Sequence, residues 1–279
     1  PDAAKRLTRQ LGLSERDISW AGLKDKQAVT RQFFSVPAKA EGAVAAFVDP
    51  EVRVLFARRH RNKLKTGHLD GNRFTLRVVS VSDAGAFRAA YERLLAAGVP
   101  NFFGEQRFGA NNAASGKKLL LRGGKGGNRF ERKLLLSSYQ SLLFNRALER
   151  RLAAGTFARA LAGDVLKKHE TGGEFVCADP AIDQPRVDAF EVSATGPMFG
   201  PKMRRAEGEV GAAEQALLDE EGIALEVFEA GGGETLGARR FFRVRLGEPQ
   251  LRLEGDVARV SFSLPAGSYA TVVLGELTR

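Results

Sequence analysis

Asp25 is the first candidate for a catalytic residue in this sequence. It lies between Lys24 and Lys26 in the run from Ala21 to Gln32, after a strand-like stretch that breaks at Gly22. Neighbouring cations favour the ionised form of a carboxylate, and an ionised carboxylate can act as a nucleophile. A polar connection between two strands often presents such a residue. On spacing alone, a solvated turn with surface ion pairs is the favoured interpretation, because charge clusters are usually just solvated; the catalytic interpretation stays open at this point.

The run from Asn101 to Gly109 is the second candidate. Its three phenylalanines offer faces on which a nucleic-acid base can stack, and its asparagine and glutamine offer donors and acceptors to a base edge. Arg107 could hold a phosphate or orient a carboxylate. A buried connector with its aromatic rings in the core is the alternative interpretation.

Two further segments carry polar side chains at places where an element could present them. Ser138, Ser141 and Asn145 are spaced three or four residues apart on one predicted helix and therefore share a face. They could support a site or a helix–helix contact. In the run from Leu264 to Thr271, Ser268 could cap a helix, and the Tyr269 ring could reach a cleft; an ordinary strand-to-helix turn is the alternative.

The positive charge of the chain is concentrated in its first part. The formal net charge is +10, which divides into +16 over residues 1–155 and −6 over residues 156–279. This asymmetry predicts a polyanionic partner, most simply RNA or DNA, for the first part. Acidic membrane lipid fits less well, because a basic amphipathic helix is missing from the pattern. The predicted phosphate contacts are Arg58, Arg59, Arg61, Lys63 and Lys65.

Several classes of chemistry find no support in the sequence. The single cysteine, Cys177, excludes an internal disulfide and a cysteine-rich zinc site. His60, His68 and His169 lack metal-ligand spacing and are predicted to be polar surface residues. The glycine-rich run 123–127 lacks the Ser or Thr of a phosphate-binding loop. We therefore expect no cofactor, no metal and no membrane, and a cytoplasmic, monomeric protein.

The elements that must position these residues mix helices and strands without regular alternation, which predicts an α+β fold with a largely antiparallel sheet. The predicted helices are Ala3–Leu11, a helix capped by Ser82 or Asp83 that ends at Gly98, Leu134–Leu152 and Glu207–Glu221. The predicted strands are Ile18–Ala21, Arg31–Val36, Val52–Arg58, Arg73–Val81, Arg239–Leu246 and Asp256–Leu264.

The change of character after about residue 155 predicts an inserted domain. We expect a basic catalytic domain in residues 1–160, an acidic α/β insertion in residues 161–245, and a return to the first domain in residues 246–279. Within the insertion, only the cluster Lys202, Arg204 and Arg205 resembles an RNA-facing surface.

Together these segments resemble the TruD family of tRNA pseudouridine synthases. The matching patterns follow the family's order along nearly the whole chain, and five matches in one order are far more specific than any one alone. They are Ala21 to Gln32, Lys63 to Phe74, Asn101 to Gly109, Ser137 to Asn145, and Leu264 to Thr271.

The resemblance implies a pseudouridine synthase fold with a mixed sheet and a family-specific insertion. It implies that the protein is an isomerase that converts a uridine of tRNA, in the family uridine-13, to pseudouridine without a cofactor. Asp25 corresponds to the catalytic aspartate, attacking either C1′ of the ribose or C6 of the uracil. Phe103 and Tyr269 match positions that stack near the target base, and Asn101 matches a position that organises the site. Lys24, Arg107 and Asn145 complete the expected substrate-binding set.

The chain departs from the family pattern before its first motif. Family members usually have several strands and a basic residue there, whereas only a short segment precedes Asp25 in this sequence. An RNA-binding protein without turnover, or a truncated synthase that lacks the N-terminal strands, is therefore the alternative hypothesis.

Overall fold

The computed structural model describes residues 2–25, 28–125 and 128–279. The chain divides into two compact units, an N-terminal unit of Pro1–Asn72 and a C-terminal unit of Arg73–Arg279. Each unit has its own apolar core. Among the described residues, no helix is long and apolar enough to cross a membrane.

A small apolar cluster holds the N-terminal unit together. The helix α1 (Asp2–Leu11) buries Ala4, Leu7 and Leu11 on one face, because residues three or four apart meet on the same side of a helix. Strands β1 (Ser19–Trp20) and β2 (Phe34–Ser35) pair antiparallel beside it. The short helices η1 (Ala38–Ala40) and α2 (Glu41–Ala45) complete this unit.

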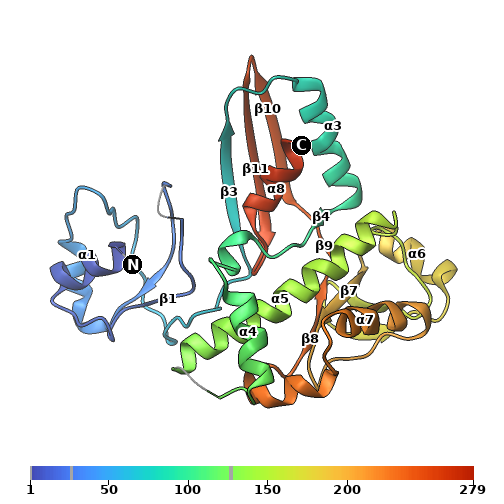
Figure 1. Ribbon diagram of the computed structural model, residues 1–279. Helices are drawn as coiled ribbons and strands as arrows, with labels where there is room; N and C mark the ends of the chain where they lie inside the picture. The colour runs from blue at the N-terminus through green and yellow to red at the C-terminus, as the bar shows by residue number, and fades with distance from the viewer. Residues whose placement is uncertain (1, 26–27, 126–127) are drawn as a thin grey trace. The chain divides into compact units, whose positions relative to one another are not determined.

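A three-stranded sheet of order β10-β11-β3 forms one half of the C-terminal unit. Its strands are β3 (Gly71–Val78), β10 (Gly247–Glu254) and β11 (Val257–Pro265). The helices α3 (Ala84–Ala97) and α8 (Ala270–Leu277) lie against this sheet (Figure 1). Their apolar side chains and those of the strands form one core cluster. The Asp83 carboxylate accepts a hydrogen bond from the backbone N–H of Ala86 at 2.8 Å and so caps α3.

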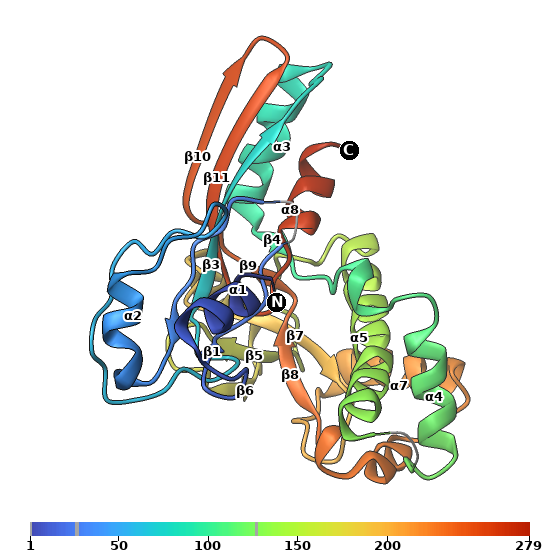
Figure 2. The same ribbon diagram turned by 90° about the vertical axis from the view of Figure 1, so that its left-hand side faces the viewer.

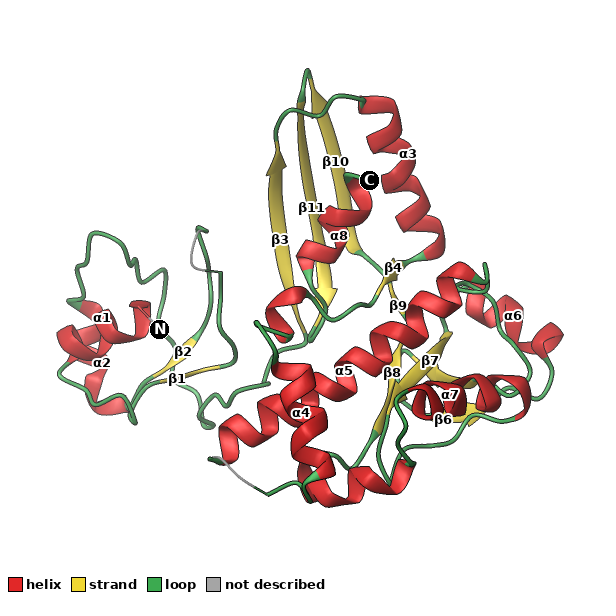
Figure 3. Cartoon of the chain, in the orientation of Figure 1, coloured by secondary structure: helices red, strands yellow, loops and turns green. Residues whose placement is uncertain are grey.

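A four-stranded antiparallel sheet of order β6-β5-β7-β8 forms the other half (Figure 3). Its strands are β5 (Val165–Lys168), β6 (Glu174–Val176), β7 (Val192–Met198) and β8 (Ala238–Phe241). The helices of this half are α4 (Asn112–Leu121), α5 (Arg129–Ala153), α6 (Pro180–Asp188), α7 (Gly208–Glu220) and the 3₁₀ segments η2 (Glu105–Arg107) and η3 (Leu225–Glu234). Strands β4 (Val99–Pro100) and β9 (Arg243–Val244) pair between the two sheets.

The helices α4 and α5 lie side by side, as both Figure 1 and Figure 2 show. Gly116 makes this close approach possible. A Cβ atom on Gly116 would lie 2.1 Å from the backbone oxygen of Leu135, which no larger residue could tolerate without moving a helix.

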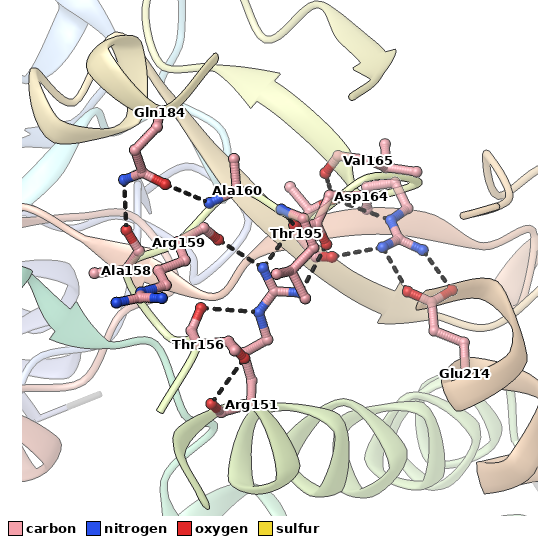
Figure 4. Close-up of polar contacts among 12 residues, drawn as sticks. Arg151, Thr156, Ala158, Arg159, Ala160, Asp164, Val165, Gln184, Thr195 and Glu214 are labelled. Atoms are coloured by element: carbon pink, nitrogen blue, oxygen red, sulfur yellow. Dashed lines mark hydrogen bonds and ion pairs between the residues drawn. The ribbon is translucent and has the colours of Figure 1, made fainter. Parts of the chain in front are cut away.

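Two buried ion pairs connect α5 and α7 to the four-stranded sheet (Figure 4). Arg151 of α5 holds both oxygens of the Asp164 carboxylate at 2.7 and 2.6 Å. Arg239 of β8 holds both oxygens of the Glu214 carboxylate at 2.9 and 2.7 Å. Each buried guanidinium is thus compensated by one carboxylate, which is the arrangement that a desolvated charge requires.

The α+β class with antiparallel sheets is confirmed. The four predicted helices are also confirmed, with ends within a few residues except that α5 begins earlier. The predicted strand Val52–Arg58 is wrong. Val52 and Val54 alternate in burial with their neighbours as a strand would, but this backbone pairs with no other strand in the described chain. The domain boundaries at 160 and 245 stay a prediction.

Candidate active site

Asn101 connects three segments of the C-terminal unit. Its side-chain nitrogen donates to the backbone oxygen of Phe241 at 3.0 Å, and its Oδ1 accepts from Arg240 at 2.7 Å and from the Ser268 hydroxyl at 3.0 Å. Its backbone N–H donates to Phe242 at 2.8 Å. The side chain is buried, so these bonds replace those it would make to water. Asn101 therefore joins the aromatic run, strand β8 and the turn before α8.

The backbone of Phe103 is held by the amide of Asn145. Asn145 Oδ1 accepts from the Phe103 N–H at 2.9 Å, and Asn145 Nδ2 donates to the Phe103 carbonyl at 3.0 Å. One side chain thus satisfies both backbone groups, as a neighbouring strand would. Ser138 lies seven residues before Asn145 on the same face of α5, and its hydroxyl donates to the Arg107 carbonyl at 2.9 Å. The polar face of α5 therefore supports the aromatic run.

The Phe103 ring is enclosed by other aromatic rings and by a guanidinium. Its centroid lies 5.6 Å from that of Phe144 and 6.3 Å from that of Tyr269, both in edge-on arrangements. The guanidinium carbon of Arg240 lies 3.9 Å from the Phe103 centroid, and that of Arg107 lies 5.8 Å away. Cations over a ring face are attracted by its quadrupole. Contacts on several sides of the ring therefore fix the orientation of Phe103.

Tyr269 approaches the backbone at Gly104. A Cβ atom on Gly104 would lie 3.1 Å from Cδ1 of the Tyr269 ring, tighter than ordinary contact, so glycine leaves room for the ring. Tyr269 is the residue that precedes α8. The prediction that Ser268 caps this helix is wrong, because the Ser268 hydroxyl instead donates to Asn101.

Arg240 is the residue of this cluster that the sequence prediction missed. It donates to the Asn101 carbonyl at 3.2 and 3.0 Å and to the Gly267 carbonyl at 2.9 Å. The pKa of Arg240 is lowered to about 10, chiefly by burial; Tyr269 opposes this lowering and Arg107 adds to it. Successive residues of a strand point to opposite faces, but the sequence does not tell which of Arg239 and Arg240 faces the site. The contact of Arg239 with Glu214 in the folded chain decides it, so Arg240 faces the other way.

The structure therefore brings together Asn101, Phe103, Arg107, Asn145 and Tyr269, which come from three distant segments of the chain. Asp25 and Lys24 belong to the N-terminal unit. Asp25 is exposed in the connection between β1 and β2, and Lys24 donates to Asn72 Oδ1. Lys26 and Gln27 of the same motif lie outside the described residues.

The five predicted phosphate contacts are all exposed. Two of them are engaged within the unit: Arg59 pairs with Glu41 at 2.6 Å, and Lys63 donates to the Arg16 carbonyl at 2.8 Å. Arg58 instead lies over the ring of Phe56, with 5.6 Å between the guanidinium carbon and the centroid.

Phe56 belongs to an exposed aromatic pair in the N-terminal unit. Phe56 and Phe33 are 58% and 68% exposed, and their centroids lie 5.8 Å apart. Large rings open to solvent beside a cation are typical of surfaces that stack unpaired bases.

His169 corrects a prediction made for the three histidines. His60 and His68 are exposed, as expected. His169 is half-buried, stacks on Phe241 with 4.3 Å between centroids, and forms a hydrogen bond with Ser193 at 2.9 Å. Burial lowers the pKa of His169, and Arg243 lowers it further. The sequence could not show this, because Phe241 lies in a distant strand.

Comparison with known proteins gives one family over the whole chain. The family model described as tRNA pseudouridine synthase D matches residues 1–124 and 129–277. A protein of Anaeromyxobacter dehalogenans with that name is 53% identical, and the match covers 100% of this chain and 82% of the relative. A protein of the same name from Thermus thermophilus is 43% identical, covering 98% and 76% of the two chains.

The fold agrees with the same family. The crystal structure of a Methanosarcina mazei protein assigned to TruD superposes with a TM-score of 0.77 and 24% identity, covering 99% of this chain and 84% of that one. The resemblance drawn from the five motifs is thus confirmed by the family model and by the identity of these relatives. The chain belongs to the TruD family of pseudouridine synthases, which are isomerases.

Proposed function

We propose that this protein converts uridine-13 of tRNA to pseudouridine, with Asp25 as the nucleophile. The observation that carries the proposal is the convergence of Asn101, Phe103 and Tyr269 on one cluster. Phe103 and Tyr269 match the family's base-stacking positions, and Asn101 matches a position that organises the site. Asp25 occupies the matching aspartate position of the first motif, and its side chain is exposed to solvent. The chemistry requires such an accessible carboxylate.

The reaction is an isomerisation in which atoms and electrons balance within the substrate. The target nucleotide leaves its stack, because its reacting atoms are not accessible within it. The carboxylate of Asp25 attacks either C1′ or C6, and the bond between N1 and C1′ breaks. The uracil rotates and C5 bonds to C1′. The bond between Asp25 and the substrate breaks, either as C5 displaces the carboxylate from C1′ or by elimination from C6, so the carboxylate is regenerated. The proton on C5 is lost while N1 gains one.

The two asparagines of the cluster serve in this proposal as positioning residues. Asn101 Oδ1 already accepts two hydrogen bonds, and both ends of the Asn145 amide are engaged with Phe103. Their contribution is to hold Phe103 and the turn of Tyr269 in place. The rings themselves would contact the flipped base, because an aromatic face accepts a base by stacking.

The basic run of the N-terminal unit is the proposed RNA backbone surface. Arg58, Arg61 and Lys65 are its principal members, because Arg59 and Lys63 have partners within the protein. Lys24 would act near the substrate. The proposed partner is tRNA, and a monomer in the cytoplasm is the simplest form in which the protein would meet it.

A direct assay tests the catalytic assignment. Purified protein is incubated with unmodified tRNA transcript, and pseudouridine is mapped chemically at each position. We expect modification at uridine-13 by the wild type, none by Asp25→Asn, and normal modification by Glu15→Gln, which neutralises another exposed carboxylate of the same unit. The affinity of Asp25→Asn for tRNA should stay close to that of the wild type.

The second candidate, an RNA-binding protein without turnover, predicts a different outcome. The wild type would bind tRNA with a steep salt dependence and form no pseudouridine at any position. Turnover by Asp25→Asn would instead show that another residue is the nucleophile.

A further inference from the structure

Arg107 and Arg240 have no carboxylate partner, and each keeps a side-chain nitrogen without an acceptor in the described chain. Buried Arg243 also lacks a carboxylate partner, but its three side-chain nitrogens donate to Ser193, Ala97 and Val187. Neither forms an ion pair within the part of the chain that the structure describes, where Arg151 is paired with Asp164 and Arg239 with Glu214. The contrast is sharpest within β8, since Arg239 and Arg240 are adjacent. The charge of Arg239 is neutralised by the Glu214 carboxylate, whereas Arg240 has no carboxylate partner.

The acceptors around Arg240 are all neutral oxygens. They are the Asn101 carbonyl, Asn101 Oδ1 and the Gly267 carbonyl, reached through Nε and Nη2. No acceptor for Nη1 is found among residues 2–25, 28–125 and 128–279. Arg240 is therefore held in place through Nε and Nη2, while the N–H groups of Nη1 stay available to donate to a ligand.

Arg107 presents a similar unused donor. Its Nε is buried and has no acceptor within the described ranges. Its guanidinium lies near the ring of Phe103, which Arg240 also covers. Two guanidinium groups thus lie near one aromatic ring, and the charge of Arg107 contributes to the lowered pKa of Arg240.

An uncompensated pair of this kind costs free energy in the unbound protein. Arrangements that cost stability without a structural gain are typical of functional sites. An anion that arrives between the two guanidinium groups would remove the repulsion and use the free donors. A neutral base edge would use the donors but leave the charge uncompensated.

We propose that Arg107 and Arg240 together bind one phosphate of the RNA chain, next to the nucleotide whose base lies against Phe103. The planar guanidinium fork matches the geometry of phosphate oxygens. Because Arg240 also covers Phe103 and bonds to Asn101, the same residue links the backbone contact to the base-stacking ring. This inference rests on the proposed function, in that it takes RNA as the ligand.

A double-perturbation binding experiment tests the proposal. A set of RNA fragments that contain the target uridine is made, each with one phosphate near that uridine replaced by an uncharged methylphosphonate. Affinities are measured for the wild type, Arg107→Gln, Arg240→Lys, and the control Arg88→Gln, which removes an exposed arginine of α3.

At one position, we expect the methylphosphonate to weaken wild-type binding about tenfold, which is the usual loss of a charge-assisted hydrogen bond. Arg107→Gln should lose a similar factor with unmodified RNA, and the methylphosphonate at that position should then weaken its binding clearly less than it weakens wild-type binding, because only Arg240 still contacts the phosphate. Its slope of log affinity against log salt should fall by about 0.7. Arg240→Lys keeps the positive charge but loses the planar guanidinium. Its RNA affinity should therefore fall, whereas its slope of log affinity against log salt should stay close to that of the wild type.

Independent effects of the two perturbations at every position would overturn the inference, because Arg107 would then hold no phosphate. That outcome would leave the proposed function intact as long as the wild type forms pseudouridine. Absence of pseudouridine with non-additive binding would instead reject the catalytic proposal and retain the phosphate contact.

Discussion

The Asn145 amide offers the sharpest test of how the fold supports the site. The change Asn145→Ala removes the acceptor of the Phe103 N–H and the donor to the Phe103 carbonyl in one step. Alanine keeps the helical propensity of α5, so the helix itself should persist. The effect should therefore be confined to the attachment of Phe103.

The magnitude follows from the two bonds that are lost. A net hydrogen bond contributes about 1 kcal/mol, and a partly buried group left without a partner costs somewhat more. We therefore expect Asn145→Ala to lower the free energy of unfolding by about 2–3 kcal/mol. Because Phe103 is then less firmly placed, kcat for pseudouridine formation should fall at least tenfold, with a smaller change in KM.

The same helix provides a matched control. Asn128 caps the N-terminus of α5, where its Oδ1 accepts from the Glu131 N–H at 2.9 Å. Asn128→Ala should therefore cost about 1 kcal/mol of stability and leave kcat unchanged. Urea unfolding and a single-turnover pseudouridine assay on both variants give the two readouts.

The reasoning would be refuted by either of two results. If Asn145→Ala unfolds with the wild-type free energy, the amide pair does not hold Phe103. If Asn128→Ala and Asn145→Ala lower kcat equally, the loss of activity reports general destabilisation rather than the position of Phe103.

Two further predictions follow from charged groups elsewhere. Burial alone would raise the pKa of Glu221, but hydrogen bonds from Lys117, Tyr139 and Arg146 lower it from 4.5 to about 2. A shift of this size means that the ionised Glu221 carboxylate contributes about 3 kcal/mol to the free energy of unfolding. This contribution is complete above pH 4.5 and is lost as the pH falls towards 2. Glu221→Gln should thus destabilise the protein by about 3 kcal/mol at pH 7 and by only about 1 kcal/mol at pH 2.5 in urea unfolding; an equal loss at both pH values would contradict this. In the basic run, Arg61→Gln should lower the salt dependence of tRNA binding more than Arg59→Gln, because Arg59 is already paired with Glu41; equal effects would show that this ion pair opens on binding.

The parts of the fold that the sequence predicted are those set by local patterns. The helices α1, α3, α5 and α7 have apolar residues at helical spacing, and Asp83 marks the start of α3. Strand predictions were weaker, because a strand requires a partner. Val52 to Arg58 has the alternation of a strand but no neighbouring backbone, and the short strands β5, β6 and β7 were not predicted at all.

By itself, the sequence determined the family and the types of residue available for chemistry, since both are carried by short runs such as Ala21 to Gln32 and Asn101 to Gly109. The tertiary structure alone decided which residues meet. Asn101 and Arg240 are 139 residues apart in the chain, and Asn101 and Ser268 are 167 apart, yet they share one hydrogen-bond network. Such contacts depend on how strands pair and helices pack over long sequence separations, which no local pattern specifies. The role of Arg240 therefore became visible only in the folded chain.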